Sequence, residues 1–320
     1  MTIALALLVL AAIGAPHALR LDTASPAIAL FIWVAALALR ALTAVFCAIF
    51  VVLYLPTTQL FTLVTHWCWH AVVPLIAAHL PLNGHALGDA ALVMPALLLV
   101  ASVLWVVVGL WRAARSVRVL LRRAVVGRGP QESLLLADGD VLVAAAGMRR
   151  PRVVISAGAL MAFDDDELAA SLEHERGHIA RRHRYVLVVA ELCRALARFL
   201  PGTRAAAREL LFHVEREADR YAVARRHDPA VLASAICKAA QGATLGAPAL
   251  ALGGGLVTRR IRLLLDGDTP VCVPAKTPLR FLASGMAALI LLTATALPSA
   301  AHAGYHQAGA VGTAHQCAVR

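Results

Sequence analysis

Charged residues are scarce in this chain, and they are absent from long stretches near both of its ends. Only 15% of the 320 residues are charged, against about a quarter in ordinary soluble proteins. Hydrophobic residues make up 60% of the chain, and the mean hydropathy is +0.73. This composition excludes an ordinary soluble protein and predicts a membrane protein whose charge is concentrated in the middle of the chain.

Four apolar runs are long enough to cross a hydrocarbon core, which takes about 20 residues, and Arg40 interrupts the second of them. Membrane helices tolerate proline, so Pro16 and Pro95 do not exclude any of these runs. The alternative is that these runs form buried helices in the core of a soluble protein, but runs of this length make that interpretation unfavourable. The first run lacks a basic segment ahead of it, so we expect a retained helix and not a cleaved signal peptide. The predicted membrane helices cover about 2–19, 33–55, 90–111 and 281–298.

Basic residues are missing from the loop 56–88, and this absence indicates an orientation. Of the 30 Lys and Arg residues, all except Arg20, Arg40 and Arg320 lie within 112–280. Because cytoplasmic loops of membrane proteins are enriched in basic residues, we expect segment 112–280 in the cytoplasm and both termini outside the cell membrane. Arg40 would then lie near the inner end of the second helix, with its side chain extended to the interface.

Two patterns that would indicate other classes of protein are also absent. Aromatic residues are not interleaved with the basic ones, so no nucleic-acid partner is expected. The cysteines form no C-x-x-C pair, and those in the cytoplasmic segment are expected to be plain thiols. A basic cluster instead follows the third apolar run, where it would meet anionic lipid headgroups. It consists of Arg112, Arg115, Arg118, Arg122 and Arg123.

Seven of the 13 histidines fall in the predicted outer segments 56–88 and 299–320. They show no clear four-ligand spacing, so we interpret the stretch THWCWH as an interfacial helix anchored by Trp67 and Trp69. A second metal site or a pH-responsive sensor is the alternative. These histidines are His66, His70, His79, His85, His302, His306 and His315.

The charged middle segment contains the pattern H-E-x-x-H. On a helix, residues i and i+4 share a face, so His174 and His178 can point at one metal ion. Glu175 is rotated away from them, where it can reach a water at the metal without being a ligand. The pattern therefore predicts a hydrolytic zinc site in which Glu175 is the general base.

The surrounding sequence predicts a small domain of helices and strands. Asp164 and Glu167 form a capping box, so the helix that carries the motif should begin there and end near residue 182. Two apolar stretches ahead of it read as a β-hairpin. The remaining predictions are a turn at 81–88, an Arg-rich amphipathic stretch at 112–132, strands at 141–147 and 152–156, helices at 185–199 and 203–226, and a Gly- and Ala-rich loop at 241–256. We interpret His183, His213 and His227, which fall on or beside these helices, as ordinary polar positions.

Catalytic zinc needs a third protein ligand, and HVEREADRYA offers two candidates. Glu215 and Asp219 are four residues apart on a predicted helix, so both can face the motif. One could be the ligand, and the other could hydrogen-bond a ligating histidine. A solvated acidic face that pairs with neighbouring arginines is the alternative.

H-E-x-x-H followed about 40 residues later by E-x-x-A-D resembles the gluzincin membrane peptidases. These include HtpX-type proteases, CAAX prenyl proteases and BlaR/MecR-type antibiotic sensors. The resemblance spans about 140–265, and the order of apolar helices is most similar to the BlaR/MecR arrangement. It implies that Glu215 is the zinc ligand, that Asp219 supports the site from the second shell, and that substrate backbone lies against the 141–147 strand. The tail 299–320 is too short for the external penicillin-binding domain of those sensors.

We therefore expect a mainly α, multi-pass membrane protein with four transmembrane helices and a cytoplasmic gluzincin-like zinc peptidase domain. Three helices lie in 1–111, the peptidase domain covers 112–280, and the fourth helix is 281–298. One Zn²⁺ per chain would be held by His174, His178 and Glu215.

The expected activity is a zinc endopeptidase that hydrolyses membrane-associated or cytoplasmic regulatory proteins. Its partners would be a protein or peptide substrate, the lipid bilayer and a cytoplasmic repressor-type protein. A BlaR-like receptor whose protease domain is gated by an external signal is one alternative. A non-catalytic scaffold is the other, although a scaffold has no use for Glu175.

Overall fold

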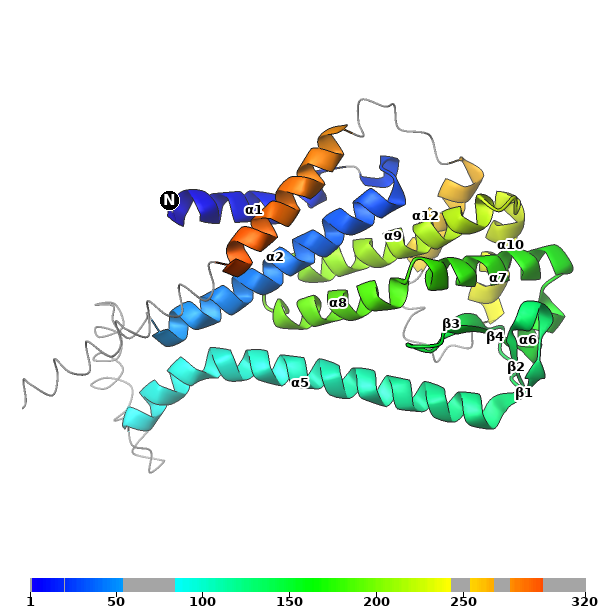
Figure 1. Ribbon diagram of the computed structural model, residues 1–320, viewed down its shortest axis with the longest axis horizontal. Helices are drawn as coiled ribbons and strands as arrows, with labels where there is room; N and C mark the ends of the chain where they lie inside the picture. Colours follow the sequence, from blue (N-terminus) through cyan, green and yellow to red (C-terminus); the bar gives the residue numbers. More distant parts are fainter. Residues whose placement is uncertain (1, 20, 54–83, 243–253, 268–276, 296–320) are drawn as a thin grey trace, which may run out of the picture.

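A computed structural model describes residues 2–19, 21–53, 84–242, 254–267 and 277–295. These residues form an elongated bundle of helices with a small four-stranded sheet at one end (Figure 1). The predicted class, a mainly helical protein with long apolar helices and a small β element, is confirmed at that level.

Three described helices are long and apolar enough to cross a membrane. The first lies in α2 (Pro26–Leu53), the second in α5 (Gly84–Ala124), and the third is Thr277–Thr295. The first apolar run of the chain forms α1 (Thr2–Ala18), whose 17 residues extend about 26 Å. That is less than the hydrocarbon thickness of about 30 Å. Three predicted crossings therefore coincide with long apolar helices, whereas a crossing by α1 stays a prediction.

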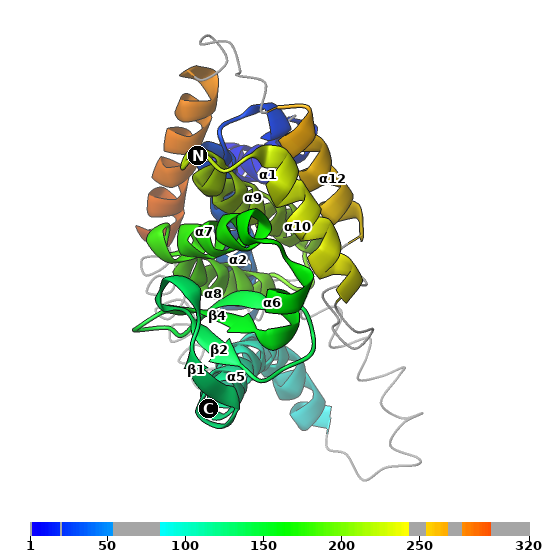
Figure 2. The ribbon, with the colours of Figure 1, turned by 90° about the vertical axis from the view of Figure 1, so that its right-hand side faces the viewer.

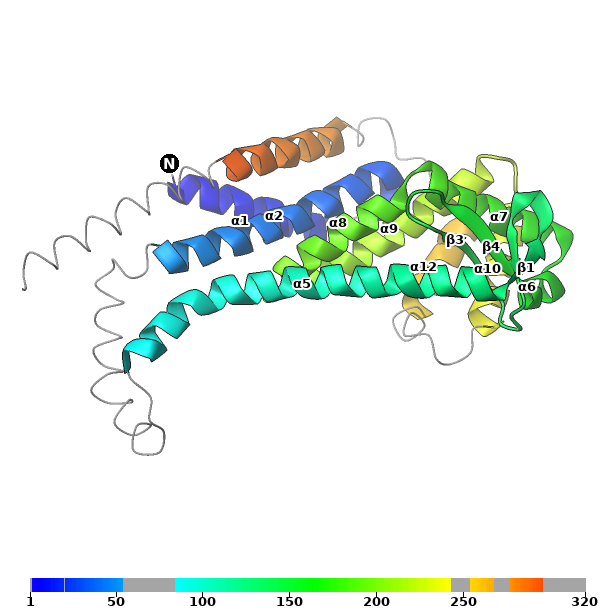
Figure 3. The same ribbon diagram turned by 60° about the horizontal axis from the view of Figure 1, so that its bottom comes forward.

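Helix α5 extends beyond the predicted crossing at both ends. The segment 84–88, predicted as part of a turn, is helical, and 112–124 continues the same helix as far as the sheet (Figure 3). The turn was predicted from Pro81 and Gly88, but a glycine is tolerated within a helix whose other residues favour it. The basic segment after the third apolar run is thus a rigid continuation of the membrane helix.

The sheet has the strand order β1-β2-β4-β3. The predicted hairpin is confirmed, since β3 and β4 pair antiparallel with Val143 opposite Ile155. Two further strands were not predicted, because 125–128 had been assigned to the amphipathic stretch after the membrane. Gly127 and Gly129 weaken that helix, and the apolar β2 then pairs parallel with β4. The strands are β1 (Val125–Arg128), β2 (Leu134–Leu136), β3 (Val143–Ala146) and β4 (Arg152–Ser156), with a short η4 (Pro130–Glu132) between the first two.

The helices after the sheet lie close to their predicted positions. Helix α7 begins at the predicted capping box, in which the Asp164 side chain accepts from the backbone N–H of Glu167 and the Glu167 side chain accepts from the backbone N–H of Asp164. Positive φ values at Arg182 (57°) and Gly202 (78°) end one helix and start the next. The helices are α6 (Ala157–Ala162), α7 (Asp165–Ala180), α8 (His183–Leu196), α9 (Thr203–Val223), α10 (Pro229–Gly242) and α12 (Gly254–Leu265).

The sheet end and the membrane end have separate cores. At the sheet end, Leu168 and Leu172 of α7 pack on Val153 and Ile155 of β4, and Figure 2 shows α7 lying over the strands. At the other end, α2 packs against α8, α9 and the helix Thr277–Thr295 in one apolar cluster. The helices α8 and α9 therefore share a core with α2, one of the helices that are long and apolar enough to cross a membrane.

Arg40 does not extend to the interface, so that prediction is wrong. Its side chain is 2% exposed and lies between α1 and α2. The guanidinium donates to the carbonyl of Ile13 at 3.3 Å and lies 2.9 Å from Nε2 of His17. A Cβ on Gly202, in the turn between α8 and α9, would lie 3.0 Å from the same guanidinium. Burial against two other elements holds Arg40 in the protein interior.

Several predictions lie outside the described residues. They concern the outer histidines of 56–83, the tail 299–320 and residues 243–253 of the predicted loop. The flanking residues 241–242 and 254–256 of that loop are helical, in α10 and α12.

Candidate active site

The H-E-x-x-H residues lie on α7, where this helix approaches α9 closely. A Cβ on Gly177 would lie 3.2 Å from the Cα of Ala218 and 3.1 Å from the Cβ of Tyr221, tighter than normal van der Waals contact. Glycine at this position therefore lets the two helices come together. Their close approach brings Glu215 and Asp219 of α9 to the histidines of α7.

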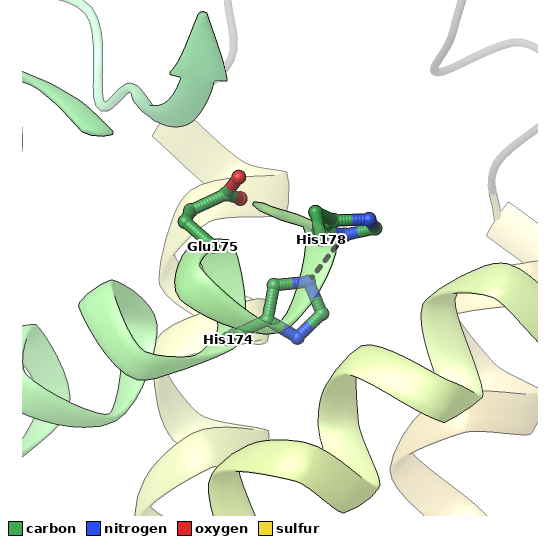
Figure 4. A group of neighbouring side chains, drawn as sticks. All are labelled: His174, Glu175 and His178. Carbon is green, nitrogen blue, oxygen red and sulfur yellow. Dashed lines mark hydrogen bonds between the residues drawn. The ribbon is translucent and has the colours of Figure 1, made fainter. Parts of the chain in front are cut away.

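Donor atoms of three side chains, His174, His178 and Glu215, converge between α7 and α9. The Nε2 atoms of His174 and His178 are 3.2 Å apart (Figure 4). The Oε2 of Glu215 lies 3.5 Å from the Nε2 of His174, and its Oε1 lies 3.6 Å from the Nε2 of His178. A carboxylate oxygen of Glu175 is within 4.8 Å of the ligand-type nitrogens of both histidines. The sequence-predicted residues therefore lie together.

Asp219 and Arg260 also contact this cluster. Asp219 Oδ1 lies 2.9 Å from Nδ1 of His174, the nitrogen that faces away from the donor cluster. Arg260 of α12 donates to both Asp219 oxygens at 2.7 and 2.9 Å, and its Nη1 lies 2.9 Å from Glu215 Oε2. No local pattern predicts this role for Arg260, because α12 is distant from the motif in the sequence.

The other side of the cluster opens into a cleft of about 270 Å³ that β3 borders. Strand β3 pairs with β4 alone among the described strands, so one of its edges is open. The backbone N–H of Ala145 points away from β4 and donates to Oε2 of Glu175 at 2.7 Å. Ala144, Ala145, Glu175, His178, Leu187 and Glu215 line the cleft.

The comparison with protein families matches residues 112–246 to peptidase family M48. This segment is an M48 peptidase domain. The chain therefore carries an M48 zinc metallopeptidase domain, which confirms the resemblance to membrane zinc peptidases. The closer likeness to BlaR/MecR-type sensors stays a prediction. No curated protein and no solved structure gave a significant match to the chain.

His183 supports the M48 site in a way that the sequence analysis missed. It had been interpreted as an ordinary polar position, but it is 1% exposed, and its Nδ1 lies 2.9 Å from the Nδ1 of His178. Its other ring nitrogen lies 3.2 Å from Oε2 of Glu217. Outer partners of this kind orient ligating histidines. The signal available in the sequence was a histidine five positions after His178, at the start of the next helix.

The electrostatics of the M48 site favour a cation. Burial opposes protonation of His174, but Asp219 and Glu215 outweigh it and raise the pKa of His174 to about 10. Burial lowers the pKa of His178 to about 4, so this imidazole is neutral and its lone pair is available. Although burial opposes ionisation of Glu215, Arg260 and His174 hold its pKa well below its usual range. Ionised carboxylates that retain a proton on His174 would also stabilise a metal cation in its place.

The donor set fits zinc. Two imidazole nitrogens and one carboxylate form a common ligand set of catalytic zinc, which leaves a fourth position open. With metal–ligand bonds of about 2.0–2.1 Å, tetrahedral ligand atoms lie about 3.3–3.4 Å apart. The separation of 3.2 Å between the two Nε2 atoms, and those of 3.5 and 3.6 Å from these atoms to the two different oxygens of Glu215, are close to this value. The residues can therefore hold Zn²⁺ with only small adjustments of their side chains.

Proposed function

We propose that this protein is a membrane-embedded zinc endopeptidase in which His174, His178 and Glu215 bind the metal. The convergence of their donor atoms beside Glu175 is the observation that supports this assignment most directly. Asp219 supports it further, because its Oδ1 lies 2.9 Å from the Nδ1 of His174, and a carboxylate partner at that nitrogen orients a ligating imidazole.

In this proposal Glu175 is the general base. When bound, zinc supplies Lewis-acid chemistry that polarises a carbonyl and makes water more acidic. Burial, with a contribution from the charge of Glu215, raises the pKa of Glu175 to about 7, which suits proton transfer near neutral pH. Its Oε2 is held by Ala145, so the carboxylate can take a proton from the attacking water and pass it to the leaving amine.

The substrate is proposed to be an extended peptide segment that lies along β3. The open edge of this strand borders the cleft that contains Glu175, His178 and Glu215. A peptide can pair with an open strand edge through its backbone, which gives affinity with little dependence on sequence. Membrane-associated or cytoplasmic regulatory proteins, including a repressor-type protein, are the substrates proposed.

The proposed orientation places the catalytic domain in the cytoplasm and both termini outside. The distribution of basic residues along the chain supports this orientation. Arg112 and Arg115 also support it, since both are exposed and lie near the C-terminal end of the apolar segment Leu97–Ser116 of α5.

A receptor whose protease is gated through the membrane helices is a second candidate. It is favoured by the shared core of α2, α9 and Thr277–Thr295, because a shift of the membrane helices would be transmitted to the helix that carries Glu215. A non-catalytic scaffold would leave Glu175 without a purpose.

The decisive experiment compares the purified full chain with Glu175→Gln and with His174→Ala/His178→Ala. Zinc content and cleavage of an unfolded protein such as β-casein would be measured in the same detergent. We expect Glu175→Gln to keep the zinc content of the wild type and lose cleavage, and the double variant to lose the zinc of the peptidase site together with cleavage. Equal cleavage by the wild type and Glu175→Gln would refute the proposed function.

A further inference from the structure

A second cluster of metal-ligand side chains lies away from the peptidase site. It consists of Asp22, Glu209 and His213, whose ligand-type atoms all lie within 4.8 Å of one another. Asp22 lies in η1 (Leu21–Thr23), the connection between α1 and α2. Glu209 and His213 are four residues apart on α9, so they share one face of that helix. The cluster thus joins the helical pair α1 and α2, here called the membrane hairpin, to the M48 domain.

His213 is the residue that points to a ligand in this cluster. Its side chain is 0% exposed, and neither ring nitrogen has a hydrogen-bond partner among the described residues. Most buried polar side chains in proteins are hydrogen-bonded, so an imidazole with two unpartnered nitrogens needs an explanation. A metal ion bound to one nitrogen would provide a partner that the protein itself does not.

The carboxylates of the cluster are currently paired with Arg259 of α12. Its Nη1 donates to both oxygens of Glu209 at 2.9 and 3.0 Å, and its Nη2 donates to Asp22. The same guanidinium lies 3.7 Å from the centre of the Phe212 ring. The single positive charge of Arg259 thus pairs with the two carboxylates of Asp22 and Glu209. If these carboxylates bind another cation, the guanidinium can keep its cation–π contact with Phe212.

We propose that Asp22, Glu209 and His213 form a second, non-catalytic binding site for a divalent cation, and that Arg259 competes with the cation for this site. One imidazole and two carboxylates form a donor set that suits Zn²⁺. The side chains of Asp22 and Glu209 are 41% and 32% exposed, so the site is open to ions from solution. The proposal does not depend on the proposed peptidase function, because none of its residues belongs to the catalytic cluster.

The position of this site connects it, through α12, to the residues of the peptidase site. Arg259 is followed directly by Arg260, which contacts Glu215 and Asp219. A cation that releases Arg259 would loosen the same turn of α12 that presents Arg260 to the peptidase site. Binding of a cation at the second site would then change how Arg260 contacts the catalytic cluster.

The test is the zinc stoichiometry of the full chain in detergent. The protein would be loaded with Zn²⁺, dialysed, and analysed for zinc per chain by elemental analysis. We expect two equivalents in the wild type, one in His213→Ala and one in His174→Ala/His178→Ala. His227→Ala, at a histidine beyond the end of α9, is the matched control and should retain two. Absence of zinc from His174→Ala/His178→Ala, or a zinc content in His213→Ala equal to that of the wild type, would overturn the proposal.

A second variant separates metal binding from damage to the fold. Arg259→Gln removes the competing charge, so it should tighten the second Zn²⁺ by about 10- to 1000-fold, the range by which a neighbouring like charge changes proton affinity. Competition with a chromophoric chelator would measure this affinity. Structural damage cannot produce tighter binding, so this arm decides the question even if His213→Ala fails to fold. An unchanged or weaker second affinity in Arg259→Gln would contradict the proposal.

Discussion

Two apolar helical segments of this protein have almost the same mean hydropathy but opposite environments. The segment Pro26–Phe50 of α2 has a mean hydropathy of 2.2, and Leu97–Ser116 of α5 has 2.1. Yet 56% of the α2 segment is buried within the protein, compared with 11% of the α5 segment. In α2 the side chains of Ile32 and Leu37 are 0% exposed, whereas Trp105 in α5 is 73% exposed.

This difference shows that hydropathy does not distinguish contact with lipid from contact with protein. The buried face of α2 contains many alanines, which let α8 and α9 approach closely, as small residues do in membrane helix interfaces. The outer faces of α5 present large side chains, which suit lipid. Helix α2 is thus part of the framework of the enzyme, while α5 connects the membrane to the sheet.

The largest expected effect comes from removing volume from the buried segment. Ile32→Ala should destabilise the protein by about 2–5 kcal/mol, because it leaves a cavity between α2 and its neighbours. Leu104→Ala in α5, at a side chain that is 58% exposed, should change stability by less than about 0.5 kcal/mol. Unfolding in detergent would measure both. Similar effects of the two substitutions would show that the two helices have equivalent environments.

A second pair of variants tests close packing at the M48 site against open packing in α5. Gly177→Ala should lower kcat/KM by about 100-fold, since a Cβ there pushes α9 and Glu215 away from the histidines. Gly109→Ala in α5 has nothing within 4 Å of the new Cβ and should leave kcat/KM unchanged. Steady-state cleavage by detergent-solubilised protein gives the comparison. Full activity in Gly177→Ala would mean that the two helices can separate without affecting the site.

The contact between α8 and α7 can be tested at His183. We expect His183→Ala to weaken zinc binding by about 10- to 100-fold, because His178 loses the partner on its outer nitrogen. His183→Asp should recover part of the affinity, since a carboxylate can accept the same hydrogen bond. Chelator competition measures the affinity. If His183→Ala binds zinc as tightly as the wild type, the contact has no role in holding the metal.

The smallest effect concerns the lipid around the two helices. Arg112 and Arg115 are exposed on α5, so replacing each with Gln should reduce the preference for anionic lipid by about 1 kcal/mol per residue. Arg40 is buried and bonded within the protein, so Arg40→Gln should leave this preference unchanged. Quenching of Trp fluorescence by brominated lipids would report it. A larger lipid effect at Arg40 than at Arg112 would reverse the assignment of the two environments.

Local signals in the sequence predicted the elements that carry the site. The capping box at Asp164, the β-hairpin and the i, i+4 spacing of His174 and His178 depend on neighbouring residues, so they can be recognised without the fold. The strands β1 and β2 were missed, because β2 forms its parallel pairs with β4, from which β3 separates it in the chain. The role of His183 was missed for a related reason, since its contact depends on the left-handed residue between two helices.

The sequence by itself therefore determined the chemistry of this protein and its membrane character. The residue types, helical spacing and length of the apolar runs are enough to predict a zinc peptidase motif in a membrane protein. Only the tertiary structure decided which apolar helices are covered by other helices and which stay exposed, and that Arg260 and His183 contact the residues of the site. It also brought Asp22 from the membrane hairpin to Glu209 and His213 of α9. These outcomes depend on contacts between segments far apart in the chain, and side-chain shape at those contacts, not average hydropathy, decides which segments pack together.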